Sequence, residues 1–167
     1  MANCHSNRAV TLIEMLVVLG IIVVLASLVI KLTLRVDNQS KERALDNAFA
    51  LVGTSLREYY EVKNGFPPQA ERNTPANALA HIEVMVRELR SVPDSRHVLD
   101  QLNPALVKSQ AGLADVPELR DPWGTVLDYV YDPDPDAGDT FPELISAGPD
   151  KQFGTGDDMS SKSRNKN

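Results

Sequence analysis

The sequence is poor in cysteine, in aromatic residues and in positive charge, and each shortage excludes a class of protein. The single cysteine, Cys4, cannot form an intramolecular disulfide, so no disulfide framework holds the fold. Aromatic residues make up only 5% of the chain, which predicts a small hydrophobic core. The formal net charge is -6, whereas nucleic-acid-binding domains normally present a basic face, so we expect no nucleic-acid partner.

Catalytic motifs are also missing. His81 and His97 have no second histidine and no cysteine at metal-binding spacing. Ser91, Asp94 and Ser95 lie close together in the sequence, but no Gly-x-Ser-x-Gly frame supports a hydrolase. We therefore expect that the chain is not an enzyme, and that both histidines are ordinary surface or packing residues.

One long apolar run, at residues 10–30, dominates the start of the chain. As a helix it would extend about 31 Å, the thickness of a bilayer's hydrocarbon core. A cleaved secretory signal has a shorter apolar core and a small-x-small cleavage site, and a buried helix is rarely apolar all round for six turns. The run therefore predicts a membrane-spanning helix.

The charges around this run bear on its orientation. Only Arg8 and the amino terminus are positive ahead of it, and the basic residues that follow are Lys31, Arg35, Lys41 and Arg43. Counting basic residues alone would place the C-terminal side in the cytoplasm.

Glu14 lies within the apolar run. A charged side chain in a membrane helix is costly unless it is paired, so Glu14 is a functional candidate. Its charge alone leaves a second interpretation open, in which Glu14 simply lies near the membrane interface.

The residues around Glu14 resemble the processing motif of type IV pilins and type II secretion pseudopilins, which is usually glycine followed by Phe-Thr-Leu-Ile-Glu. The matching residues are Thr11, Leu12, Ile13 and Glu14. The resemblance implies that a prepilin peptidase removes residues 1–9 as a leader, cuts between Ala9 and Val10 and methylates the new terminus. It also implies that Glu14 pairs with the Val10 amine of an adjacent subunit, and such pairing makes a buried charge tolerable. Ala9 replaces the usual glycine, and Val10 replaces the usual phenylalanine.

The helix is expected to continue beyond the membrane to about residue 63. No proline occurs between residues 38 and 62, and Asn64-Gly65-Phe66-Pro67-Pro68 then stops the helix. Apolar residues recur at three- and four-residue steps: Leu45, Phe49, Val52, Leu56 and Tyr60. This stripe predicts the face that packs on a sheet.

Residues 64–159 are expected to form a globular domain. A helical insert at about 74–103 carries a stripe of Leu79, Ile82, Val86 and Leu89, with a second short helix at 95–102. A β region at about 121–147 contains strands at 126–131 and 141–146. The basic, polar tail at 160–167 is expected to be disordered. No role is assigned to the insert at residues 70–118.

The β region opens with Asp-Pro-Trp-Gly at residues 121–124. This motif, the tyrosine-containing strand after it and Gly-Pro-Asp at 148–150 resemble the C-terminal region of the major pseudopilins of type II secretion. We expect Trp123 to fill the core under the sheet.

The resemblance implies a calcium loop at residues 146–158. Asp150, Asp157 and Asp158 would supply side-chain oxygens, with the carbonyls of Ala147 and Phe153 as companions. Calcium binds oxygen ligands and needs neither histidine nor cysteine. A second acidic stretch, at 132–143, looks superficially like an EF-hand loop, but its glycine is one place late and two prolines stiffen it. A solvated hairpin loop is the simpler interpretation of that stretch.

Together these features predict an α+β, pilin-like fold, in which a long N-terminal transmembrane and spine helix packs on a small antiparallel β-sheet. The resemblance implies a calcium-stabilised subunit of a periplasmic pseudopilus that drives export by type II secretion. It further implies a single-pass inner-membrane location with a periplasmic C-terminal domain, which is the opposite of the orientation that the basic residues alone indicate. The implied partners are further copies, other pseudopilins, the prepilin peptidase and the inner-membrane assembly platform.

Three alternatives stay open. A type IV pilin or a competence pseudopilin would share the fold, although many of those close the C-terminal region with a disulfide. A membrane-anchored periplasmic metal-dependent enzyme would need histidine or cysteine near its carboxylates, and neither occurs between Gln101 and Asn167. A calcium-binding module with a plain membrane anchor would have no need of Thr-Leu-Ile-Glu.

Overall fold

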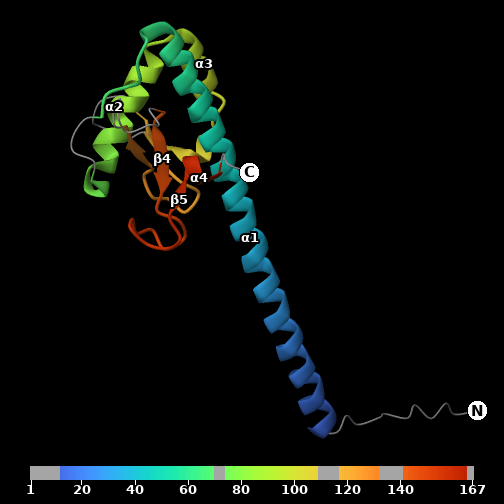
Figure 1. The fold of residues 1–167 in the computed structure, drawn as a ribbon. Helices are drawn as coiled ribbons and strands as arrows, with labels where there is room; N and C mark the ends of the chain where they lie inside the picture. The colour runs from blue at the N-terminus through green and yellow to red at the C-terminus, as the bar shows by residue number, and fades with distance from the viewer. Residues whose placement is uncertain (1–11, 70–73, 109–116, 132–140, 165–167) are drawn as a thin grey trace, which may run out of the picture. The chain divides into compact units, whose positions relative to one another are not determined.

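The computed structural model describes residues 12–69, 74–108, 117–131 and 141–164, with the side chains of 28–35 and 164 outside the description. The chain divides into two compact units, Met1–Ser40 and Lys41–Asn167. Helix α1, Leu12–Lys63, begins in the first unit and ends in the second (Figure 1). The fold is α+β, with an N-terminal helix packed on small antiparallel sheets, which confirms the predicted class.

The first unit exposes its apolar side chains. Leu12 is 83% exposed, and Val23 is still 67% exposed about three turns later. Among the side chains that the structure describes, which stop at Ser27 and resume at Val36, no helix is both long enough and apolar enough to cross a bilayer. The membrane span at residues 10–30 therefore stays a prediction.

The second half of α1 supplies one wall of the core. Four of the predicted stripe residues are buried: Leu45, Phe49, Val52 and Leu56. The fifth was wrong: Tyr60 is 41% exposed, and Tyr59 is buried in its place. Tyr59 follows Leu56 by three residues, which keeps the buried stripe close to the helical period of 3.6 residues per turn. The Tyr59 hydroxyl also donates a hydrogen bond to Glu88 Oε2 at 2.8 Å.

The end of α1 agrees with the prediction. Asn64 has a φ of 54°, in the left-handed region that asparagine tolerates, and its N–H donates to the carbonyl of Tyr60 at 2.7 Å. The prolines that follow cannot continue the helix.

The insert forms two helices, α2 at Ala78–Arg90 and α3 at Pro93–Leu99, flanked by the 3-10 turns η1 at Pro75–Asn77 and η2 at Pro104–Leu106. The predicted Ile82, Val86 and Leu89 are buried, whereas Leu79 is 38% exposed. The buried face of α2 runs through Ala78 and Met85 instead. Helix α3 begins two residues earlier than predicted because proline suits the first helical position.

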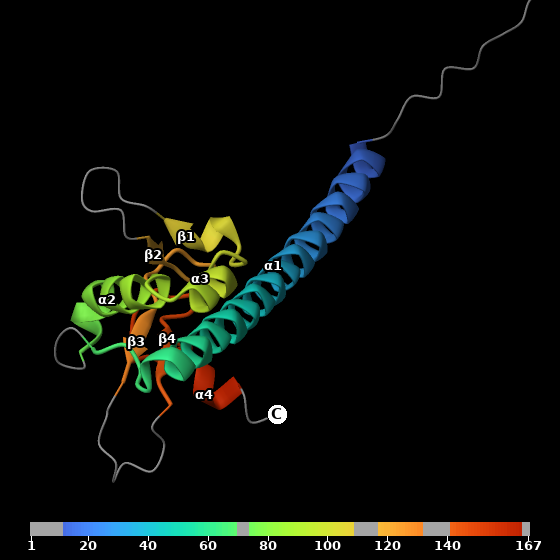
Figure 2. The same ribbon diagram turned by 90° about the horizontal axis from the view of Figure 1, so that it is seen from above.

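Two antiparallel sheets complete the second unit. Strands β1, Val107–Lys108, and β2, Glu118–Leu119, form a two-stranded ribbon that the sequence did not predict. The larger sheet has the order β3-β4-β5, from Asp128–Val130, Glu143–Ser146 and Met159–Ser160. Helix α2 packs on β3, and α3 packs on α2 (Figure 2). Both expected strands are thus present but shorter than predicted.

The predicted disordered tail is wrong for its first five residues. Met159 and Ser160 pair with β4, and α4 at Ser161–Arg164 packs beside β4 and β5 (Figure 1). The Ser161 hydroxyl accepts the N–H of Leu144 at 2.9 Å. Main-chain pairing explains the order, because a polar segment can join a sheet edge through its backbone alone.

Candidate functional site

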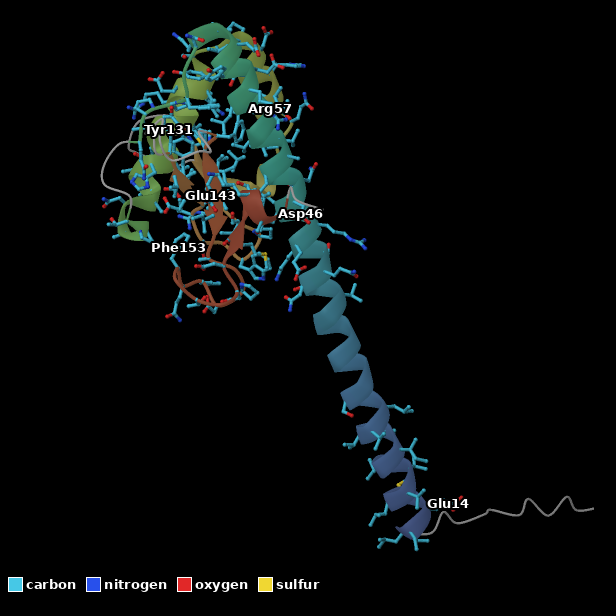
Figure 3. All side chains as sticks on the ribbon, in the orientation of Figure 1. Glu14, Asp46, Arg57, Tyr131, Glu143 and Phe153 are labelled. Atoms are coloured by element: carbon cyan, nitrogen blue, oxygen red, sulfur yellow. The ribbon has the colours of Figure 1, made fainter. Side chains whose placement is uncertain are left out.

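The N-terminal site can be followed only from Leu12 onward. Ala9 and Val10, the predicted processing and assembly positions, lie outside the described residues. Glu14 lies in the first turn of α1, where a negative charge complements the positive end of the helix dipole (Figure 3). Its side chain is exposed.

Apolar side chains surround Glu14. Ile13 is 71% exposed and Met15 is 59% exposed. Soluble monomers rarely expose contiguous apolar surface on this scale. The start of α1 is therefore suited to an apolar environment from outside the chain, such as lipid or another apolar helix.

The predicted calcium loop follows β4 directly. Ser146 and Ala147 are buried, and Gly148 turns the chain with a φ of +66°. A Cβ at Gly148 would lie 2.3 Å from the carbonyl oxygen of Asp157 and 3.1 Å from its Oδ2. Only glycine permits this approach, so the two ends of the loop are held against each other.

The three predicted aspartates organise the loop through its backbone. Asp157 Oδ2 accepts the N–H of Asp150 at 3.0 Å, which joins two of the predicted side-chain ligands across the loop. Asp150 Oδ1 accepts the N–H of Gln152 at 2.8 Å, and Asp158 Oδ2 accepts the N–H of Gly154 at 2.7 Å. Asp158 Oδ1 is buried and has no hydrogen-bond partner among the described residues. A buried oxygen without a partner is costly unless a cation or water meets it.

Asp157 is held in its charged form. The Thr155 hydroxyl, at 2.5 Å from Oδ1, and the Asp150 N–H lower the pKa of the Asp157 carboxyl below its usual value. A carboxylate that stays ionised is the form that a cation requires.

The side chains alone do not make a metal centre. In the described part of the chain, no group of three or more histidine, cysteine, aspartate or glutamate side chains could hold a metal ion. Calcium differs from most metals because backbone carbonyls and water supply much of its coordination. The predicted carbonyl donors are Ala147, which is buried, and Phe153, which is half-buried on the same loop (Figure 3).

Asp121 ties the loop to the Asp-Pro-Trp-Gly turn, and the sequence analysis assigned it no such role. Its carboxylate is buried, and Oδ1 accepts the N–H groups of Trp123 at 3.0 Å and Thr125 at 2.8 Å. Oδ2 accepts the Ser146 hydroxyl at 2.8 Å, and the Ser146 oxygen accepts the N–H of Gly148 at 3.1 Å. The sequence signal was the motif itself, since aspartate commonly caps a turn through the N–H two residues on.

Trp123 is only partly the core residue that we expected. It packs against the core cluster but is half-buried, and its indole N–H is buried without a hydrogen-bond partner among the described residues.

The histidines differ from each other. His97 is exposed, as expected of a surface residue. His81 is fully buried on α2, and its Nδ1 lies 2.7 Å from Oδ1 of the buried Asp128 on β3. Gln69 Nε2 lies 3.4 Å from His81 Nε2. His81 therefore has a packing role that joins the insert to the sheet.

The serines of the insert have structural partners. The Ser55 hydroxyl donates to the carbonyl oxygen of Ser95 at 2.9 Å, which fixes α3 to α1. The Ser91 hydroxyl donates to the carbonyl oxygen of Glu88.

Of the acidic stretch at 132–143, only 141–143 lie within the described residues, and Glu143 accepts a hydrogen bond from Ser160.

Comparison with known proteins bears on the N-terminal segment alone. Residues 4–30 match the family model described as the prokaryotic N-terminal methylation motif. No curated protein and no solved structure matched the chain. The motif supports a place in the pilin superfamily. It implies processing by a prepilin peptidase and assembly into pilin-like polymers, and it indicates membrane anchoring. It points to a structural subunit rather than an enzyme.

Proposed function

We propose that this chain is a structural subunit of the pseudopilus of a type II secretion system, anchored in the inner membrane with its second unit in the periplasm. The supporting observation is the methylation motif at residues 4–30, which contains Glu14. The narrower proposal of a major pseudopilin is supported by the resemblance of Asp-Pro-Trp-Gly at 121–124 and Gly-Pro-Asp at 148–150 to that type. The buried Asp121 connects that turn to Ser146 at the start of the glycine-rich loop.

The chemistry of assembly rests on two groups. After cleavage, the Val10 amine would carry a positive charge that Glu14 of a neighbouring copy can meet. In an apolar environment each charge is costly alone and tolerable in a pair. The exposed apolar residues around Glu14 would supply that environment when copies assemble.

Processing and assembly can be tested together. The intact mass of the membrane-extracted protein should correspond to a chain that starts at Val10 and carries one methyl group. Glu14→Ala should still insert into the membrane but should assemble at most a small fraction of the wild-type filaments, measured by shearing and electron microscopy. Glu14→Asp, which keeps the charge, is the matched control. A mature chain starting at Met1, or normal filaments from Glu14→Ala, would overturn the proposal.

We further propose that the loop at residues 146–158 binds calcium. Asp150, Asp157 and Asp158 would hold the ion with the carbonyls of Ala147 and Phe153, and calcium would supply structural cross-linking only. The donor set fits, because all of these ligand atoms are oxygens and Asp158 Oδ1 is buried without a partner among the described residues.

Calcium that binds only the folded loop stabilises the domain by mass action, by about 2.7 kcal/mol at 100 times the dissociation constant. Residues 36–167 should therefore melt at a higher temperature with calcium than with a chelator. Asp157→Ala should abolish this difference, whereas Asp94→Ala, on the exposed surface of α3, should retain it. An equal melting temperature in folded, metal-free protein with and without added calcium would contradict the site and leave the filament proposal standing.

A further inference from the structure

The loop at residues 146–158 is attached to the larger sheet at both ends. Strand β4 leads into the loop and β5 leads out of it, and Ser146 pairs with Met159 where the two strands meet (Figure 1). Inside the loop the backbone of Gly148 lies against Asp157, since a Cβ there would come within 2.3 Å of the Asp157 carbonyl oxygen. The path of the chain at the start of the loop therefore affects where Asp157, a proposed calcium ligand, can lie.

The Ser146 hydroxyl is held by two hydrogen bonds. The residue is fully buried, its hydroxyl donates to Asp121 Oδ2 at 2.8 Å, and its oxygen accepts the N–H of Gly148 at 3.1 Å. A hydroxyl has one proton to donate, and here the carboxylate of Asp121 takes it. The oxygen is thus held as an acceptor for the backbone of the loop.

This acceptor fixes the direction of the Ala147 carbonyl. The Ala147 carbonyl and the Gly148 N–H belong to one peptide group, which is planar and trans. The two bonds of a trans peptide point in opposite directions. Because the N–H points at Ser146 Oγ, the Ala147 oxygen points away from it and cannot turn unless the hydrogen bond breaks. The Ala147 carbonyl is one of the two proposed backbone ligands of calcium.

Asp121 holds the serine in turn. Its side chain is buried, and Oδ1 accepts the N–H groups of Trp123 at 3.0 Å and Thr125 at 2.8 Å. The main chain closes the same turn, because the Gly124 N–H donates to the Asp121 carbonyl at 3.0 Å. One carboxylate therefore joins a closed turn of the chain to Ser146, 25 residues further on.

We propose that Asp121 and Ser146 are positioning residues for calcium binding, an inference that rests on the proposed calcium loop. Neither side chain contacts the ion. Together they hold the Ala147 carbonyl in the direction that coordination requires before calcium arrives. Residues that orient metal ligands in this way typically contribute about 10–100-fold to metal affinity.

The test measures the Kd for calcium by isothermal titration calorimetry, on the full chain in detergent micelles after a chelator has removed bound metal. Ser146→Ala should weaken calcium binding about 10–100-fold, because the Gly148 N–H loses its acceptor and the Ala147 carbonyl can turn. Asp121→Ala should weaken it in the same range, because the serine hydroxyl loses its anchor. Each variant is titrated at a temperature at which its melting curve shows it folded.

Asp121→Asn is the conservative variant. Its amide oxygen can accept the same two backbone N–H groups, and its amide nitrogen can donate to the oxygen of Ser146, which has two lone pairs. The geometry of the loop is then kept although the charge is removed. Asp121→Asn should therefore retain most of the calcium affinity that Asp121→Ala loses.

Two controls distinguish positioning from general stability. Val92→Ala shortens a buried core side chain between α2 and α3, so it should lower the melting temperature and leave the Kd for calcium unchanged. Ser91→Ala removes an exposed serine hydroxyl that bonds to the backbone of α2, and it should bind calcium as the wild type does.

Hydrogen exchange at the Gly148 amide reports the positioning contact itself. In calcium-free ¹⁵N-labelled chain, exchange at this amide should be slow in the wild type and in Asp121→Asn, because the N–H is bonded to Ser146 Oγ. It should be fast in Ser146→Ala. The variants with fast exchange should be those with weak calcium binding.

Four results would overturn the inference. Wild-type affinity in both Ser146→Ala and Asp121→Ala would do so and leave the calcium site standing. Fast exchange of the Gly148 amide in the wild type would mean that the carbonyl is not held before calcium binds. An equal loss of affinity in Val92→Ala would mean that the loss follows general stability. A wild-type chain that binds no calcium would overturn the calcium site together with this inference and leave the filament proposal standing.

Discussion

The two units of this chain differ in the exposure of the apolar side chains on helix α1. Within the described part of the first unit the apolar residues of α1 stay exposed, and Leu19 is 60% exposed. In the second unit the same helix buries one stripe completely, with Leu45, Val52 and Leu56 at 0% exposure. One continuous α-helix thus serves two purposes, because the pattern of its side chains changes from apolar all round to amphipathic.

The two units also differ in what covers their apolar side chains. The stripe of the second unit is covered by α2, α3 and the sheet, so its burial contributes to the stability of the folded chain. The apolar surface of the first unit has no such cover among the described residues of the chain. Burial of this apolar surface stabilises the protein only when lipid or another copy of the chain covers it.

The largest expected effect compares one leucine from each unit. Leu56→Ala should lower the free energy of unfolding by about 2–5 kcal/mol, because it leaves a cavity in the core. Leu19→Ala should change it by less than about 0.5 kcal/mol, because its side chain is already exposed. Urea unfolding in detergent, followed by the fluorescence of the single tryptophan, Trp123, in the second unit, measures both. Equal losses for the two variants would break the comparison.

A smaller effect is expected in the C-terminal loop. Gly148→Ala should destabilise the second unit by about 1–3 kcal/mol, because φ is positive and the new methyl group would collide with the Asp157 carbonyl. Gly156→Ala is the matched control, since no atom lies within 4 Å of its Cβ position. Thermal melting of the two variants distinguishes a specific contact from general flexibility, and similar melting temperatures would argue against the contact.

The smallest effect concerns pH. The pKa of Asp157 is lowered in the folded loop, so its hydrogen bonds stabilise the fold above the ordinary pKa of an aspartate and this contribution is lost as the pH falls through the lowered value. Asp157→Asn should therefore flatten the pH dependence of stability on the acidic side, below about pH 4. Melting curves of the wild type and the variant, recorded without calcium from pH 2.5 to pH 7, test this; parallel curves would contradict it.

The sequence determined much of the architecture on its own. The apolar periodicity, the absence of proline and the Asn-Gly-Phe-Pro-Pro stop were sufficient to place the end of α1 at Lys63. Thr-Leu-Ile-Glu was sufficient to mark the methylation motif. Both signals are local, because they depend on residues within a few turns of one another.

Only the tertiary structure decided which residues meet across the chain. It selected Tyr59 over Tyr60, paired the buried His81 with Asp128 and ordered residues 160–164 beside β4. It also placed Asp121 between the tryptophan turn and Ser146. These outcomes depend on backbone groups and on partners that are distant in sequence, and a hydrophobic pattern carries no information about either. The same reason separates the two units. Composition alone makes residues 10–30 apolar, but only packing shows that the second unit covers its own stripe while the described apolar side chains of the first unit stay exposed.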